Sequence, residues 1–228
     1  MLTTSERNIF YNLCDETHVM IGGTTGSGKS TLIHDIISCL TSYTVETQQI
    51  VLIDLKRIEL FQWRDDPHTL ETATEPEDVN PCLDRVIDLM ERRYTEMMKA
   101  KTTVCKRSHV HVIIDEVAEV LKVRGVEKRL DKLLRLARAA HIHLVMATQA
   151  INRKTVPADI QANITCLIGL RCRSAIESRQ IIGQKGCEVL PKYGKAYILN
   201  SDGLQLIDIP VATKNDFDIT KEAWYEIA

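Results

Sequence analysis

The sequence predicts an α/β protein in which helices cover both faces of a mostly parallel β-sheet. Two features of its 228 residues support this prediction. Apolar runs typical of buried strands alternate along the chain with segments whose apolar residues have helical spacing. A glycine-rich loop also joins the first of these strands directly to the first helix. Because strands and helices that alternate in this way connect through right-handed crossovers, we expect a parallel sheet.

The first half of the chain supplies two expected strands and one helix. A short apolar run at residues 19–21 precedes the glycine-rich loop, and apolar positions over residues 32–40 predict the helix that follows it. The stretch 50–60, IVLIDLKRIEL, is a continuous apolar run that breaks into charge, which is typical of a buried parallel strand. The polar stretch 61–81 contains prolines and is expected to be mainly loop, with room for a short strand.

The second half continues the alternation and then becomes less regular. No linker or internal repeat divides the chain, so we expect one domain over residues 1–228, with residues 1–17 as a short lead-in. The expected elements are a helix at 82–101 with Pro81 at its start, a strand at 110–116, a helix at 126–140, a strand at 141–149, strands at 164–172 and 195–199 with a helix at 174–182 between them, and a segment at 204–211 that is a candidate for closing the sheet edge.

The composition is that of an ordinary soluble globular domain, with 44% hydrophobic and 26% charged residues. No apolar run approaches the length of a membrane span, and the N-terminus does not have the apolar core of a signal peptide, so we expect a cytoplasmic chain. The formal net charge of −2 argues against a uniformly basic surface. It leaves nucleic-acid binding open, because basic residues on a few loops are enough to create a local positive field.

The cysteines and histidines do not form a recognisable metal site. Seven scattered cysteines, mostly in apolar surroundings, are typical of reduced thiols in a cytosolic protein. Two His-x-His pairs, His109/His111 and His141/His143, would each share one face of a strand, so metal binding is conceivable. We favour polar residues at the entrance of buried strands, because no cysteine or carboxylate completes a ligand set.

The loop GTTGSGKS at residues 23–30 has the spacing of a P-loop: glycine, four residues, glycine, lysine and serine. Its strand and helix neighbours match the setting that this motif requires. The loop's backbone N–H groups would converge on phosphate oxygens at a helix N-terminus. Lys29 would reach the β- and γ-phosphates, and the Ser30 hydroxyl would bind Mg²⁺. The residues expected to bind ATP are Gly23, Thr24, Thr25, Gly26, Ser27, Gly28, Lys29, Ser30 and Thr31.

Acidic and amide side chains end the next strands. Asp115 follows the run VHVII and would orient Mg²⁺, while Glu116 directly after it would polarise an attacking water. Gln149 ends the following strand and is a candidate sensor of the γ-phosphate. An acid at position 116 favours hydrolysis of the nucleotide over transfer of its phosphate to another substrate.

Other P-loop classes fit less well. A signalling GTPase needs an Asn-Lys-x-Asp element, and TKND at 213–216 has these residue types in the wrong order. The Ser-Gly-Gly-Gln signature of transporter ATPases does not occur. Motors that hydrolyse ATP often receive an arginine from a neighbouring subunit, which stabilises charge in the transition state. The candidates downstream of the acidic pair are Arg138, Arg171, Arg173 and Arg179.

Along most of its length, the chain resembles the motor domain of the FtsK/SpoIIIE family of DNA translocases. The loop GTTGSGKS is identical to that family's P-loop, and LIDLKRIEL is similar to its Ile-Asp-Pro-Lys-Arg-x-Glu-Leu strand. The further blocks that carry the resemblance, in the family's order, are DPHTL, TEPEDV, MERRY, IIDEVAEVL, RLARAAHIHLVMATQ, IQANI and ESRQIIGQKGCEVL.

The resemblance implies a RecA-like fold and a homo-oligomeric ring, usually hexameric, in which ATP hydrolysis drives double-stranded DNA through the central pore. It also implies that Asp115 and Glu116 form the Walker B pair and that Gln149 is the sensor. Arg179 aligns with an arginine of the family and ranks first as the residue donated in trans, and Arg138 ranks second.

The chain departs from the family pattern in ways that bear on its grip on DNA. Leu55 replaces a proline, Ala150-Ile151 replaces an Arg-Pro pair, and Gln161 stands where lysine is common. The stretch YGKAYIL replaces a Gly-Asp-Met stretch. Cations are thus lost near the loop that should face DNA, and Arg153 and Lys154 are candidates to compensate for them.

The chain has little room before the P-loop. About twenty residues precede the strand of the P-loop, so we expect the family's preceding domain, membrane segments and DNA-reading winged helix to be absent, and to come from a membrane-anchored or DNA-reading partner chain.

Two alternative functions stay open. The first alternative is a related secretion ATPase that moves protein. The second is an assembly module that binds ATP with negligible turnover, against which Lys29, Ser30 and the acidic pair argue.

Overall fold

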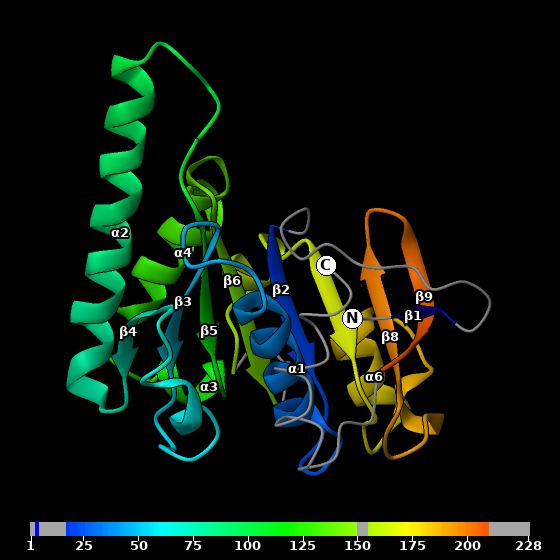
Figure 1. The fold of residues 1–228 in the computed structure, drawn as a ribbon. Coiled ribbons are helices and arrows are strands. Elements are labelled where there is room, and N and C mark those ends of the chain that lie inside the picture. The colour runs from blue at the N-terminus through cyan, green and yellow to red at the C-terminus, as the bar shows by residue number, and fades with distance from the viewer. Residues whose placement is uncertain (1–2, 5–16, 150–154, 210–228) are drawn as a thin grey trace.

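The structure, a computed structural model, describes residues 3–4, 17–149 and 155–209 (Figure 1). The described strands form one sheet in the order β1-β9-β8-β7-β2-β6-β5-β3-β4. The strands β7, β2, β6, β5, β3 and β4 pair with one another in parallel, and β8, β9 and β1 add antiparallel strands beside β7. The strands are β1 Thr3–Thr4, β2 His18–Gly22, β3 Gln48–Ile53, β4 Thr69–Ala73, β5 His109–Ile114, β6 Ile142–Thr148, β7 Cys166–Gly169, β8 Lys195–Asn200 and β9 Gly203–Asp208.

Helices cover both faces of this sheet, as the sequence predicts. Figure 1 shows α1 in front of the sheet, with α4 and α6 behind it. The α-helices are α1 Lys29–Thr41, α2 Pro76–Lys99, α3 Val117–Val120, α4 Val126–Leu136, α5 Ala158–Ala162 and α6 Ala175–Ile182, and the 3₁₀ turns are η1 Phe61–Trp63, η2 Ala137–Ala140 and η3 Cys187–Val189.

The central strands divide their apolar side chains between two cores, one on each face of the sheet. In β5, Val112 and Ile114 join the core formed with α2 and α4, while Ile113 between them joins the core formed with α1. Successive side chains of a strand point to opposite faces, so a strand buried on both faces is apolar at most of its positions. This explains why the strands appear as continuous apolar runs in the sequence.

The register of the sheet brings the ends of four strands to one edge. Gly22 of β2 lies opposite Thr148 of β6, and Ile114 of β5 lies opposite Met146 of β6 and Ile53 of β3. Because these strands are parallel, the loops that follow them all leave from the same edge. Open α/β sheets bind ligands in this position, beyond the carboxyl ends of the strands.

The sequence prediction fails most clearly between residues 61 and 81. Helix α2 begins at Pro76, so the last part of the expected loop is helical and Pro81 lies inside the helix rather than at its start. Proline is well tolerated at the first helical position, which Pro76 occupies, and Glu77 and Asp78 favour the positive end of the helix. Pro81 removes one backbone donor near the helix start, and the burial of Val79 and Leu83 on the core compensates for its loss.

Smaller differences concern boundaries. The expected helix at 126–140 is α-helical only to Leu136 and continues as the 3₁₀ turn η2. The expected edge strand at 204–211 forms β9, which is the penultimate strand because Thr3–Thr4 pair outside it.

Two global properties follow from the described residues. Within these residues, no helix combines the length and apolar character needed to cross a bilayer. The cysteines at 39, 82, 105, 166, 172 and 187 are free thiols, and Cys14 lies outside the described residues.

Candidate active site

The P-loop runs from the end of β2 into the first turn of α1. Gly28 precedes the helix with φ of +96°, a left-handed conformation that glycine adopts at little cost. Gly23 is required for a different reason, because a Cβ atom there would lie 2.6 Å from Ser27 Oγ. No side chain caps the N-terminus of α1, so its first N–H groups keep their capacity to bind an anion.

Lys29, the first residue of α1, folds back over the loop. Its Nζ donates hydrogen bonds to the carbonyl oxygens of Gly23 at 2.8 Å and Thr24 at 3.2 Å. Burial lowers the pKa of Lys29, and attraction to Glu116 and Asp115 opposes this shift. The lysine therefore lies in the field of the two carboxylates that follow β5.

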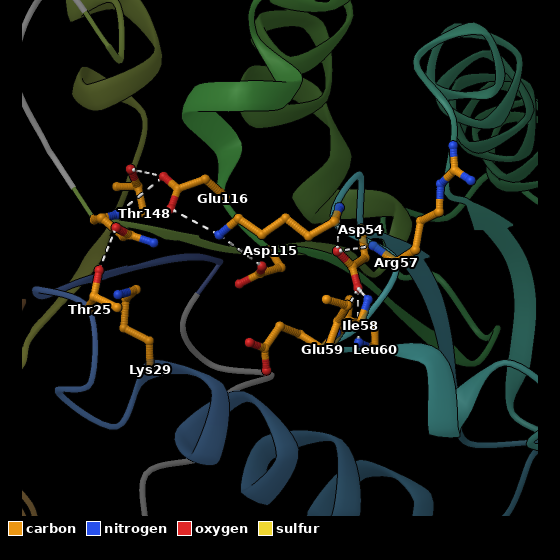
Figure 2. A network of polar contacts seen from close by, with 12 residues as sticks. Thr25, Lys29, Asp54, Arg57, Ile58, Glu59, Leu60, Asp115, Glu116 and Thr148 are labelled. Atoms are coloured by element: carbon orange, nitrogen blue, oxygen red, sulfur yellow. Dashed lines mark hydrogen bonds and ion pairs between the residues drawn. The ribbon is translucent and has the colours of Figure 1, made fainter.

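Asp115 and Glu116 follow β5 at the same edge of the sheet as the P-loop, and Figure 2 shows Lys29 on the facing side of the site. Asp115 is buried, and its Oδ2 atom accepts no hydrogen bond within the described structure. Burial raises the pKa of Asp115 to about 6; Lys56 opposes this shift, and Asp54 adds to it. An acceptor oxygen held in this way has the chemistry of a ligand for a hard cation.

Glu116 has an unusual backbone conformation and three partners for its carboxylate. Its φ of +54° is uncommon for a residue other than glycine, and such strain is typical of functional positions. Oε1 accepts hydrogen bonds from Thr148 Oγ1 at 2.8 Å and from the Gln149 backbone N–H at 3.2 Å, and Oε2 lies 3.6 Å from Lys56 Nζ. These contacts hold the buried carboxylate of Glu116 in one orientation.

Gln149 joins this pair to the P-loop. Its side-chain Oε1 accepts a hydrogen bond from Thr25 Oγ1 at 2.8 Å. Glu116, Gln149 and Lys56 line one open pocket of about 790 Å³. The loop after β2 and the end of β6 are therefore linked through polar side chains (Figure 2).

Three residues near the site were missed by the sequence reasoning: Asp54, Lys56 and Thr148. Asp54 follows β3 and is buried beneath the loop that carries Lys56. The sequence signal for the first two lies in the block LIDLKRIEL, which is similar to a strand of the family but does not by itself show where these side chains lie. Thr148 gave no signal, because a threonine at the end of a strand is common.

The two ranked arginines lie in different elements. Arg179 is exposed on α6. Arg138 is exposed in η2, which leads into the start of β6, so it lies at the end of the sheet opposite the P-loop of its own chain. Arg171 is adjacent to the P-loop, since its carbonyl oxygen accepts a hydrogen bond from Thr24 N at 3.1 Å.

The remaining sequence-predicted positions have simpler roles. The Gln161 side chain donates to the Val156 carbonyl at 2.7 Å and so braces α5. Arg153 and Lys154, expected to compensate for lost cations, lie outside the described residues. The four histidines of the two His-x-His pairs stack at the start of β5 and β6, and the described residues contain no group of three or more side chains suited to hold a metal ion.

The fold and the loop together define a RecA-like P-loop NTPase. The model of the FtsK/SpoIIIE family matches residues 3–109. The chain is 32% identical over 212 residues to the DNA translocase FtsK of Staphylococcus aureus strain Mu50, which covers 82% of this chain and 27% of that protein. The chain therefore belongs to the FtsK/SpoIIIE family, and it spans about a quarter of the length of this relative.

Solved structures share the fold. The cytoplasmic domain of the type VII secretion ATPase EccC from Thermomonospora curvata superposes with a TM-score of 0.73 at 24% identity, over 91% of this chain and 28% of that one. The pCW3 conjugation coupling protein TcpA, in its monomer form with ATPγS, superposes with a TM-score of 0.82 at 18% identity, over all of this chain and 70% of that one.

Proposed function

We propose that this chain is the ATPase core of a motor that hydrolyses ATP to move double-stranded DNA. The observation that carries the proposal is the position of Glu116, which faces the P-loop and is held by the end of β6. Membership of the FtsK/SpoIIIE family, with a relative named as a DNA translocase, supports DNA as the substrate. The single sheet also supports one domain over residues 1–228, most of whose lead-in at 1–17 lies outside the described residues.

The residues present fit Mg²⁺-ATP. Gly23 to Thr31 would hold the phosphates through backbone N–H groups at the start of α1. Ser30 and the buried Oδ2 of Asp115 would hold Mg²⁺, for which oxygen ligands are the preferred donors. When bound, Mg²⁺ neutralises phosphate charge.

The protein's own groups then have distinct tasks. Lys29 leaves the carbonyls of Gly23 and Thr24 and binds phosphate oxygens. Glu116 accepts a proton from the attacking water, and its orientation is set by Thr148 and the Gln149 backbone. The Gln149 side chain, bonded to Thr25 of the P-loop, is positioned to respond to the occupant of that loop.

We propose that the working form is a homo-oligomeric ring, expected to be hexameric. Exposed Arg179 is our first candidate for an arginine donated to a neighbouring site, and Arg138 is the second. Subunits with Arg179→Ala retain a P-loop, and subunits with Lys29→Ala retain the arginine. If Arg179 acts in trans, mixtures of the two variants recover activity that neither has alone. If the mixtures stay as inactive as the separate variants, Arg179 does not have this role.

The decisive measurement is ATP hydrolysis by the purified chain with and without long linear double-stranded DNA, at low and moderate salt. Contacts with DNA phosphates release counterions, so stimulation by DNA should weaken steeply as salt rises. Lys29→Ala should abolish nucleotide-dependent activity, whereas Glu116→Gln should retain nucleotide and hydrolyse it poorly. Normal hydrolysis by Glu116→Gln would refute the role of Glu116.

Moving a protein substrate is the second candidate function. The fold shared with a secretion ATPase and the net charge of −2 favour it. Under this alternative, ATP hydrolysis would be indifferent to DNA. A basal rate that is very slow and unaffected by Glu116→Gln would instead support an assembly module that binds ATP.

A further inference from the structure

The loop that follows β3 is organised around one buried carboxylate. Asp54 Oδ1 accepts the backbone N–H of Lys56 at 2.9 Å and of Arg57 at 3.1 Å. Its other oxygen, Oδ2, accepts three more N–H groups, from Ile58 at 3.1 Å, Glu59 at 2.9 Å and Leu60 at 3.1 Å. Figure 2 shows these donors gathered around Asp54.

This arrangement fixes a backbone that would otherwise be unfavourable. Arg57 has φ of +59°, a conformation that residues other than glycine rarely adopt. Charge-assisted hydrogen bonds to a carboxylate are stronger than neutral ones, so five of them to Asp54 hold the loop in one shape. The Cα atom of Lys56 is therefore held at a defined place above the end of β3.

From that place, the Lys56 side chain reaches both acidic residues of the site. Its Nζ lies 3.7 Å from Asp115 Oδ2 and 3.6 Å from Glu116 Oε2. No other ion pair of the described residues involves either carboxylate. Lys29, the other nearby cation, bonds instead to carbonyl oxygens of the P-loop.

The adjacent Arg57 forms an ordinary surface ion pair, which serves as a comparison for the contacts of Lys56. Arg57 pairs with Glu75, and the arginine side chain is 61% exposed. Such surface pairs contribute little because water screens them. The Lys56 side chain is itself 41% exposed, but its partners Asp115 and Glu116 are only 5% and 9% exposed, against 32% for Glu75.

We propose that Lys56 is a positioning residue for Glu116, and that Asp54 acts by holding Lys56 in place. The ammonium group offsets the repulsion between two neighbouring buried carboxylates and holds Oε2, while Thr148 and the Gln149 backbone hold Oε1. Glu116 is thereby aimed from two sides. This inference rests on the proposed ATP hydrolysis and explains why an aspartate and a lysine occur two residues apart in LIDLKRIEL.

The test compares Lys56→Met, Lys56→Arg, Asp54→Asn and the double variant Asp54→Asn/Lys56→Met with the wild type. Arg57→Met is the matched control, because it removes a cation from the same loop without touching the acidic pair. Three quantities are measured: steady-state ATP turnover, the affinity for ADP, and the thermal unfolding midpoint, which identifies a variant that has merely lost its fold.

Lys56→Met should lower turnover roughly ten- to a hundredfold, the size of effect expected when a reacting group is misplaced. ADP affinity and the unfolding midpoint should stay close to those of the wild type, and Lys56→Arg should recover part of the turnover. Asp54→Asn should also lower turnover but add nothing in the Lys56→Met background, because both changes act through the same side chain. Arg57→Met should behave as the wild type.

A readout that does not need turnover separates this inference from the proposed function. Mn²⁺ binding in the presence of ADP can be followed by electron paramagnetic resonance. Because Lys56 Nζ lies 3.7 Å from Asp115 Oδ2, the oxygen that would hold the divalent cation, Lys56→Met should bind Mn²⁺ roughly threefold to tenfold more tightly than the wild type or Arg57→Met.

The outcomes are distinguishable. Wild-type protein that binds nucleotide without hydrolysing it refutes the proposed function, and Mn²⁺ affinity then decides whether Lys56 engages the carboxylates. Unchanged Mn²⁺ affinity in Lys56→Met overturns the inference. So does normal turnover in that variant, or a loss of ADP affinity that accounts for the lost turnover. Additive effects of Asp54→Asn and Lys56→Met would overturn the link between these two residues.

Discussion

The hydrogen bond from Thr148 to Glu116 allows a sharp test of how the site orients its base. Thr148→Val replaces the donor hydroxyl with a methyl group at the end of β6. Thr148 is fully buried, so water cannot readily replace the lost donor. Glu116 Oε1 would keep only the longer bond from the Gln149 backbone, at 3.2 Å instead of 2.8 Å.

The expected magnitude follows from the kind of bond that is lost. A hydrogen bond to a charged group contributes about 1.5–3 kcal/mol, more than a bond between neutral groups. If Thr148 acts mainly by orienting Glu116 in the transition state, this range corresponds to a loss of turnover of roughly tenfold to 150-fold. Thr148→Ser keeps a hydroxyl at the same position and should retain most of the activity.

The assay is steady-state ATP hydrolysis by wild type, Thr148→Val and Thr148→Ser, with ADP affinity and thermal unfolding measured on the same preparations. A loss of turnover at unchanged ADP affinity is expected for Thr148→Val. The reasoning is refuted if this variant binds ADP normally and hydrolyses ATP within about threefold of the wild type, which is less than one such bond contributes. Equal losses in Thr148→Val and Thr148→Ser would also refute it, because the hydroxyl would then not be the cause.

Other predictions concern stability. Gly169→Ala should lower the free energy of unfolding by about 1–3 kcal/mol in urea titrations, because its Cβ would lie 2.5 Å from Cys187 Sγ; an unchanged midpoint would mean that the site relaxes freely. Leu130→Ala, at a fully buried position of α4, should cost about 2–5 kcal/mol, whereas Leu136→Ala, 43% exposed, should cost far less; similar losses would contradict the assigned core. Burial lowers the pKa of His18 to about 4, so as pH falls below about 6.5 the unfolded chain takes up the proton first. The free energy of unfolding should therefore decrease by about 3 kcal/mol between pH 6.5 and 4 on account of this residue. His18→Asn should lose that part of the pH dependence, and an unaltered pH profile would show that His18 is not its source.

The sequence by itself determined the features that depend on local spacing. Gly23, Gly28, Lys29 and Ser30 fall within eight consecutive residues, so the P-loop can be recognised without knowing any distant contact. The strands buried on both faces were equally clear, because most positions of such a strand are apolar. Asp115 and Glu116 could be placed beside the loop because the carboxyl ends of parallel strands share one edge of the sheet.

Only the tertiary structure decided which side chains meet at that edge. Thr148 is 32 residues from Glu116, and Thr25 is 124 residues from Gln149, so no sequence period connects either pair. Lys56 reaches the acidic pair only because β3 is the immediate neighbour of β5 in the sheet. The start of α2 was missed for the same reason, since the packing of Val79 and Leu83 on the sheet outweighs the cost of Pro81 within the helix. Local spacing determines which backbone conformations are favourable. Contacts between residues distant in the sequence depend on the order and register of the strands, which are set only when the whole chain packs.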